Sequence, residues 1–98
     1  MSARGLLAGL IAALTLASGA SAGKFVEIES EGRPPVRLVG YMARPTGPGP
    51  FPAVVLLHGC GGFHSSMISW ADRLSRLGYA ALAVDSFGPR GIDDDCNE

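Results

Sequence analysis

The residues best suited to chemistry stand together after a short apolar run. Five apolar residues, Ala53 to Leu57, lead directly into His58, and Gly59, Gly61 and Gly62 follow within four positions. Glycines let the backbone turn sharply and leave its amide N–H groups unobstructed by side chains. Donors of this kind, held in place, stabilise the negative charge that develops on a carbonyl oxygen during acyl transfer. The segment therefore predicts a loop that can form an oxyanion hole.

Three side chains in or beside this loop could also take part in catalysis. His58 could be a general base, but in hydrolases with a strand–turn–helix nucleophile the catalytic histidine comes last along the chain. We expect His58 instead to hold the loop by hydrogen bonding. Cys60 could be a nucleophile if it occupied a Gly-x-(Ser/Cys)-x-Gly turn, yet His58 stands where the first glycine belongs, so this is the weaker hypothesis. His64 is expected at the solvent or at the rim of a pocket.

The two cysteines, Cys60 and Cys96, could form a disulfide, although both could equally pair elsewhere. Their spacing with His58 and His64 matches no common zinc pattern, so we predict no metal site. The acidic run Asp93-Asp94-Asp95 also lacks the alternating spacing of a calcium loop and is expected to be solvated.

A dinucleotide-binding loop is the alternative interpretation of the glycine cluster. That motif needs Gly-x-Gly-x-x-Gly, and here His64 occupies the position of the third glycine. Asp85 does follow the next apolar run, as an acidic residue would in such a site. A Rossmann-type oxidoreductase therefore stays open as the second enzyme class, although no cofactor is predicted.

Strands and one helix must position these residues. Residues 25–29 alternate apolar and acidic side chains, and 36–43 form a second apolar run after a Gly/Pro-rich turn, which predicts an antiparallel hairpin at a sheet edge. Continuous apolar runs at 53–57 and 79–84 predict parallel strands buried on both faces. Between them, apolar residues recur at helical spacing, with Ser65 or Ser66 as the expected N-cap and Gly78 as the C-cap glycine. The fold class is therefore α/β, an edge hairpin followed by a βαβ unit.

The first 22 residues predict a cleaved signal peptide rather than part of the fold. A positive charge at Arg4, an apolar stretch from Leu6 to Leu16 and the small-residue site Ala20-Ser21-Ala22 occur in that order. The apolar stretch is too short to span a bilayer of about 30 Å. We expect a periplasmic or secreted protein without stable membrane insertion after cleavage. The net charge of −1 and the scattered basic residues argue against nucleic acid as a partner.

Two longer segments resemble the N-terminal part of an α/β-hydrolase of the dienelactone hydrolase family. They are Phe51 to Gly62 and Gly78 to Gly91, which ends in Asp-Ser-Phe-Gly-Pro-Arg-Gly. The resemblance implies that a backbone N–H of Gly59 or Cys60 is an oxyanion-hole donor and that Arg90 holds a substrate carboxylate. It also implies a small-molecule carboxylic ester or lactone as the substrate. One departure is His58, which stands where better-known members carry a glutamate.

Residues 23–98 make up about half of a typical domain, so we expect an incomplete α/β-hydrolase domain. The nucleophile, acid and late histidine cannot be assigned within it. The parent protein is expected to be a hydrolase and this chain alone to be inactive. A non-catalytic remnant is the other alternative.

Overall fold

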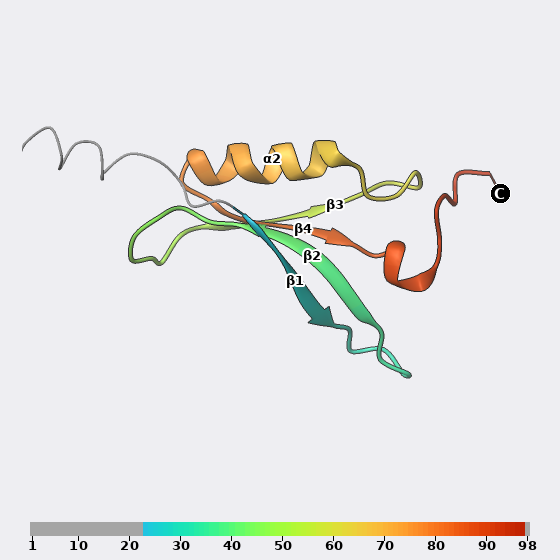
Figure 1. The fold of residues 1–98 in the computed structure, drawn as a ribbon. Coiled ribbons are helices and arrows are strands. Elements are labelled where there is room, and N and C mark those ends of the chain that lie inside the picture. The colour runs from blue at the N-terminus through green and yellow to red at the C-terminus, as the bar shows by residue number, and fades with distance from the viewer. Residues whose placement is uncertain (1–22, 98) are drawn as a thin grey trace, which may run out of the picture.

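The computed structural model describes residues 23–97, so the predicted signal peptide lies outside the described residues. One four-stranded sheet, in the order β1-β2-β4-β3, carries helix α2 on one face (Figure 1). The elements in chain order are β1 (Lys24–Glu29), β2 (Arg37–Ala43), β3 (Ala53–Leu57), α2 (Ser65–Arg76), β4 (Ala80–Asp85) and the short 3₁₀ helix η1 (Gly88–Arg90).

The predicted hairpin is present, with β1 and β2 antiparallel from Lys24↔Met42 to Glu29↔Arg37. Ser30 closes the turn end of the hairpin. The Ser30 N–H donates to the carbonyl of Val36 at 2.9 Å, and the Val36 N–H donates to the Ser30 hydroxyl oxygen at the same distance. This pair of bonds satisfies the backbone just before the proline-containing turn.

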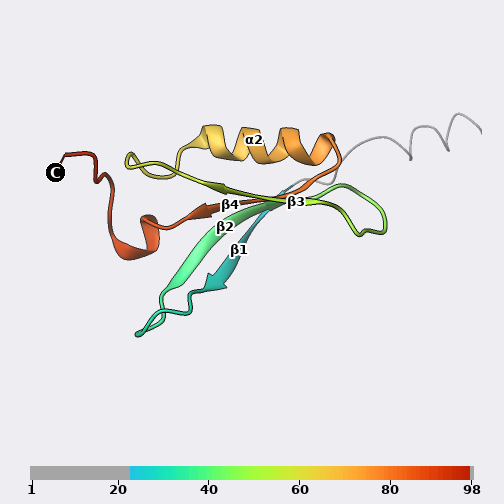
Figure 2. The same cartoon turned by 180° about the vertical axis from the view of Figure 1, so that it is seen from behind.

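The βαβ unit is also present, because β3 and β4 are parallel and α2 connects them. β4 pairs on its other side with β2, antiparallel, from Val39↔Asp85 to Ala43↔Ala81. Parallel strands end at the same edge of a sheet, so the loops that follow β3 and β4 lie at one end of the molecule (Figures 1 and 2). The residues that are candidates for catalysis and substrate binding lie at this end.

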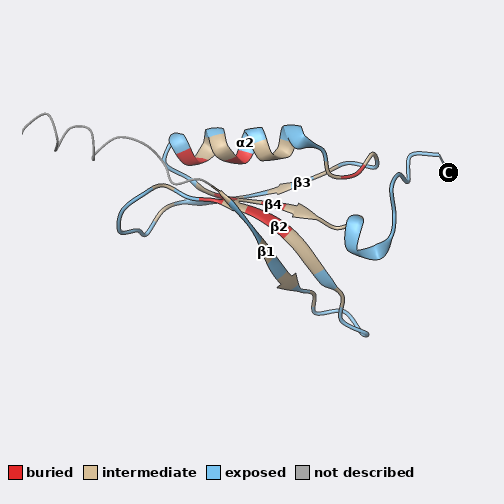
Figure 3. Cartoon of the chain, viewed as in Figure 1, coloured by how far each residue is buried: buried red, intermediate tan, exposed pale blue. Residues whose placement is uncertain are grey.

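The core lies between α2 and the sheet (Figure 3). Its buried residues are mostly alanines, from β2, β4 and the inner face of the helix, and one tyrosine: Tyr41, Ala43, Ala71, Ala81 and Ala83. Small side chains let a helix approach a sheet closely. Larger side chains that are partly buried then fill the edges of this contact, namely Leu56, Phe63, Met67, Ile68 and Leu74.

The opposite face of the sheet has no helix over it in the described chain. The strands at 53–57 and 79–84 are expected to be buried on both faces only where helices cover both sides of the sheet, and the described chain supplies a helix for one side. Val55 is 59% exposed and Leu57 is 76% exposed, whereas Val54 and Leu56 on the same strand face α2 and are partly buried. One helix can cover only one side of a sheet.

The predicted C-terminal cap of α2 is present, whereas its N-cap differs from the prediction. His64, with extended backbone angles, is the N-cap instead of Ser65 or Ser66, and its carbonyl accepts the Met67 N–H at 3.0 Å. Gly78 follows the C-cap with a φ of 101°, a conformation that glycine adopts without a Cβ penalty, as predicted. Within residues 23–97, α2 is too short and too polar to cross a bilayer, and no other helix does so.

Candidate functional site

The glycine loop, residues 58–62, leaves the end of β3 as a tight turn. The Gly62 N–H donates to the carbonyl of Gly59 at 3.1 Å, which closes the turn. Gly62 has a φ of 89°, and a Cβ there would lie 3.0 Å from the carbonyl oxygen of Asp93. Both the backbone conformation and the close neighbour therefore require glycine at this position.

His58 joins the glycine loop to the loop after β4. Its Nε2 lies 3.1 Å from the backbone N of Ser86 and 3.0 Å from the Ser86 Oγ, and its Nδ1 lies 2.8 Å from the carbonyl oxygen of Gly59. A backbone N–H can only donate and a carbonyl can only accept, which fixes the proton on Nδ1. The ring is neutral in this arrangement, its side chain is only 3% exposed, and it meets Phe87 edge-on with centroids 4.6 Å apart.

A covalent bond and a hydrogen bond fix the middle of the glycine loop from the other side. Cys60 and Cys96 form a disulfide, with their Cα atoms 4.9 Å apart. The neighbouring Asp95 N–H donates to the carbonyl of Cys60 at 2.8 Å. Because the Cys60 sulfur is used in this bond, it is not available as a thiolate nucleophile.

The anchoring leaves three consecutive backbone donors of the loop unused. None of the hydrogen bonds among residues 23–97 takes the N–H of Gly59, Cys60 or Gly61. The carbonyls of Gly59 and Cys60, by contrast, both accept hydrogen bonds. Rigid backbone with free donors is the arrangement that stabilises an oxyanion without reorganisation.

Arg90 is exposed and belongs to η1. Its Nη1 donates to the carbonyl of Ser86 at 2.6 Å, so the guanidinium bonds within its own loop. The carboxylate of Asp85 starts this loop by accepting the N–H groups of Phe87 at 3.0 Å and Gly88 at 2.9 Å. Arg90 thus stands at the same end of the sheet as the glycine loop.

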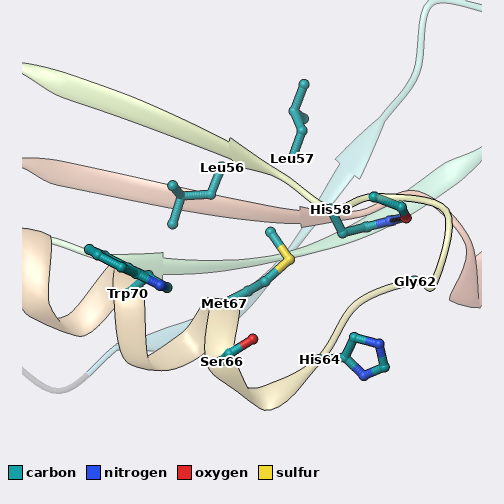
Figure 4. Close-up of a pocket in the computed structure, with 9 residues that line it drawn as sticks. Leu56, Leu57, His58, Gly62, His64, Ser66, Met67 and Trp70 are labelled. Carbon is teal, nitrogen blue, oxygen red and sulfur yellow. Dashed lines mark hydrogen bonds between the residues drawn. The ribbon is translucent and has the colours of Figure 1, made fainter.

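A pocket of about 310 Å³ opens between the end of β3 and the start of α2 (Figure 4). His64 lies at its rim and is exposed, as expected. The pocket has a polar end beside the glycine loop and an apolar end under the helix. Its lining residues are Leu56, Leu57, His58, Gly59, Gly62, His64, Ser66, Met67 and Trp70. A polar end next to unused backbone donors, continued by an apolar wall, suits a substrate with an acyl group.

Ser86 is a residue of the site for which no role was predicted from the sequence. A signal for it was present, because Ser86 directly follows a strand that was expected to be parallel to the one before His58. Polar residues in these two positions meet at one sheet edge, and a histidine–serine contact could have been inferred from that placement.

Residues 38–98 match the model of the dienelactone hydrolase family. Two solved structures resemble the chain. One, named m3DLH, is 34% identical with a TM-score of 0.54, and the match covers 66% of this chain and 27% of that one. The other is from Klebsiella pneumoniae subsp. pneumoniae MGH 78578, and its name gives it provisionally as a dienelactone hydrolase. It is 27% identical with a TM-score of 0.56, and the match covers 76% of this chain and 32% of that one. The chain therefore spans about a third of these relatives or less, and no curated protein matched it.

Proposed function

Because the chain belongs to the dienelactone hydrolase family, we propose that it forms the oxyanion-binding part of a hydrolase for small carboxylic esters or lactones. The acyl-enzyme forms on a serine or cysteine that lies outside the described residues. The family match favours this function over a Rossmann-type oxidoreductase. A non-catalytic remnant is the competing hypothesis, and the experiment below separates the two.

The free N–H groups of the glycine loop are the observation that carries this proposal. Gly59 or Cys60 supplies one donor to the developing oxyanion, and the residue after the nucleophile supplies the other. The disulfide, the Asp95 bond and the His58 bonds support the donor by fixing the loop on both sides. Loss of a single oxyanion donor typically costs 10²–10³ in kcat, so the rigidity of this loop matters for the rate.

Ser86 and His58 form a serine–histidine hydrogen bond, but we assign it a structural role. The Nε2 atom has one lone pair, and it already accepts the backbone N–H of Ser86 at 3.1 Å. A general base needs that lone pair for the proton of the attacking hydroxyl. We propose that the contact ties the two loops together and that Ser86 is not the nucleophile.

Arg90 is the proposed anchor for a substrate carboxylate. A planar guanidinium binds a carboxylate through two parallel N–H bonds, which lysine cannot reproduce. One of its nitrogens is bound to the Ser86 carbonyl, and the exposed remainder of the fork is available to a ligand.

The proposed location is the periplasm or the cell exterior, after cleavage between Ala22 and Gly23. The three-part N-terminal pattern supports it, and the disulfide is in keeping with an oxidising compartment. N-terminal sequencing of exported protein should begin at Gly23, and full-length protein confined to the cytoplasm would contradict this location.

The experiment treats the complete protein with an activated aryl ester and an enol-lactone and traps the acyl-enzyme for peptide mapping. We expect one labelled serine or cysteine outside residues 23–97. Label on Ser86 would show that the loop contact is catalytic, and no acyl-enzyme with either substrate would favour the remnant.

His58→Gln keeps an acceptor for Ser86 and His58→Asn keeps a donor for the Gly59 carbonyl. Because the Ser86 contact joins the loops, Gln should preserve more of kcat than Asn.

A further inference from the structure

Gly23, the first described residue, lies directly against the side chain of Tyr41. A Cβ at position 23 would overlap the Cζ and the hydroxyl oxygen of Tyr41, so only glycine fits without displacing the phenol. Tyr41 itself is held in place: it is 8% exposed, and Phe25 packs on its ring edge-to-face at 5.3 Å. Residue 23 is therefore set beside a fixed hydroxyl group.

The hydroxyl group leads on to a carboxylate. The Tyr41 O–H donates to Asp72 Oδ1 on α2 at 2.6 Å, a distance typical of a charge-assisted bond. This bond, together with burial, raises the pKa of the Tyr41 phenol, while the backbone N–H of Gly23 lowers it by hydrogen bonding to the same group. Tyr41 thus lies between Gly23, which its hydroxyl end closely approaches, and the Asp72 carboxylate, to which its hydroxyl group is hydrogen-bonded.

The sequence places a processing site at the start of this chain. The small-residue motif Ala20-Ser21-Ala22 predicts cleavage between Ala22 and Gly23. A signal peptidase adds water across that peptide bond, which leaves a carboxylate on Ala22 and an amine on Gly23. The amine takes up a proton at neutral pH, since a free α-amino group has a pKa of about 7.7–8.0.

We propose that cleavage after Ala22 creates an ammonium group at Gly23 that binds the Tyr41–Asp72 pair and completes the fold at the start of β1. Before cleavage, position 23 offers one neutral N–H; afterwards it offers a positive charge beside the phenol that bridges to Asp72. This inference rests on the cleavage proposed above. Cleavage one residue earlier or later would place the charge away from Tyr41.

Asp72 is the acidic group that the geometry assigns to this ammonium. The other charged side chains of the neighbouring elements are Lys24, Glu27 and Glu29 on β1, Arg37 on β2, and Arg73 and Arg76 on α2. Within the described chain, none of them is hydrogen-bonded to Tyr41, and Glu27 lies 3.7 Å from Arg37. Glu27 is thus a matched control for the loss of one negative charge.

The experiment measures the pKa of the Gly23 amine in protein exported from the 98-residue chain. Trace acetylation with acetic anhydride between pH 6 and 10 is followed by mass spectrometry, and Lys24, the single lysine, is the internal standard. A nearby carboxylate favours the charged amine. We expect a pKa at least about half a unit above the free value, lowered by Asp72→Asn and unchanged by Glu27→Gln.

A further variant inserts one serine between Ala22 and Gly23, which moves the ammonium one residue away while Asp72 stays. Its amine should titrate like that of a free peptide although circular dichroism shows the same fold. A free-peptide pKa in the unmodified chain overturns the proposal, and so does a raised pKa that Asp72→Asn or the insertion leaves in place. A mature N-terminus other than Gly23 would instead refute the cleavage itself, whatever the enzyme's activity.

Discussion

Removing the disulfide by replacing Cys60 and Cys96 with serine should destabilise the chain severely. The two cysteines are 36 residues apart. In the loop-closure model, opening a loop of that length returns about 13 cal/mol/K of entropy to the unfolded chain, or about 4 kcal/mol at 25 °C. A domain of about 75 residues has a total stability on the order of 4–11 kcal/mol. The disulfide therefore contributes a large fraction of the stability.

The assay is urea unfolding of the chain from residue 23, followed by fluorescence of Trp70, the single tryptophan. With a slope of about 1 kcal/mol/M for a small protein, the midpoint should fall by several molar, or the cooperative transition should vanish. Wild-type protein reduced with a phosphine should behave like the double serine variant. A loss below about 1 kcal/mol would refute the reasoning, because the loop from Cys60 to Cys96 would then not restrict the unfolded chain.

Three further outcomes are expected. The pKa of Tyr41 is raised in the folded chain, so the contribution of Tyr41 to stability is complete below the unfolded pKa of about 10 and is lost as the pH rises through the folded pKa. Tyr41→Phe should therefore remove this loss of stability at alkaline pH, measured by urea unfolding at pH 8 to 11. If the variant still lost stability at alkaline pH, the loss would belong to another group. Val55→Thr, on the uncovered face, should reduce self-association in sedimentation velocity at little cost in stability. Val54→Thr, on the face toward α2, should instead lower the free energy of unfolding by about 1–2 kcal/mol. Equal losses of stability in the two variants would contradict the assignment of faces. Gly40→Val should lower the free energy of unfolding by about 1–3 kcal/mol, because even a Cβ at position 40 would lie 2.9 Å from a methyl carbon of Leu82 on the neighbouring strand. An unchanged urea midpoint would show that the sheet adapts to the larger side chain.

The elements of this fold could be predicted from the sequence, because each has its own local pattern. The apolar run Ala53–Leu57 has the bounds of β3, and Gly78 marks the end of α2. The pairing of β2 with β4 could not be predicted, since a hydrophobic pattern identifies a strand but not its neighbour. The His64 cap was missed for a similar reason: serine is the better cap by preference, yet the extended backbone at His64 starts the helix one residue earlier.

Part of the candidate site followed from residue type alone. Glycines after a buried strand indicated free N–H groups, and the structural role expected for His58 agrees with its bonds to Gly59 and Ser86. The link from Tyr41 to Asp72 joins residues 31 positions apart and has no local signal in the sequence. It depends on how α2 packs across β2, which only the assembled fold determines.

The position of β4 has a consequence for the order in which this sheet can assemble. β4 is the last strand of the described residues, yet it lies inside the sheet and pairs with β2 on one side and β3 on the other. During synthesis the β1–β2 hairpin can form locally, whereas β3 has no partner until residue 80 and those after it are available. Long-range pairing of this kind slows folding, because loop-closure entropy is lost before the contacts form. The sheet, and with it the glycine loop, should therefore appear in one late step rather than strand by strand.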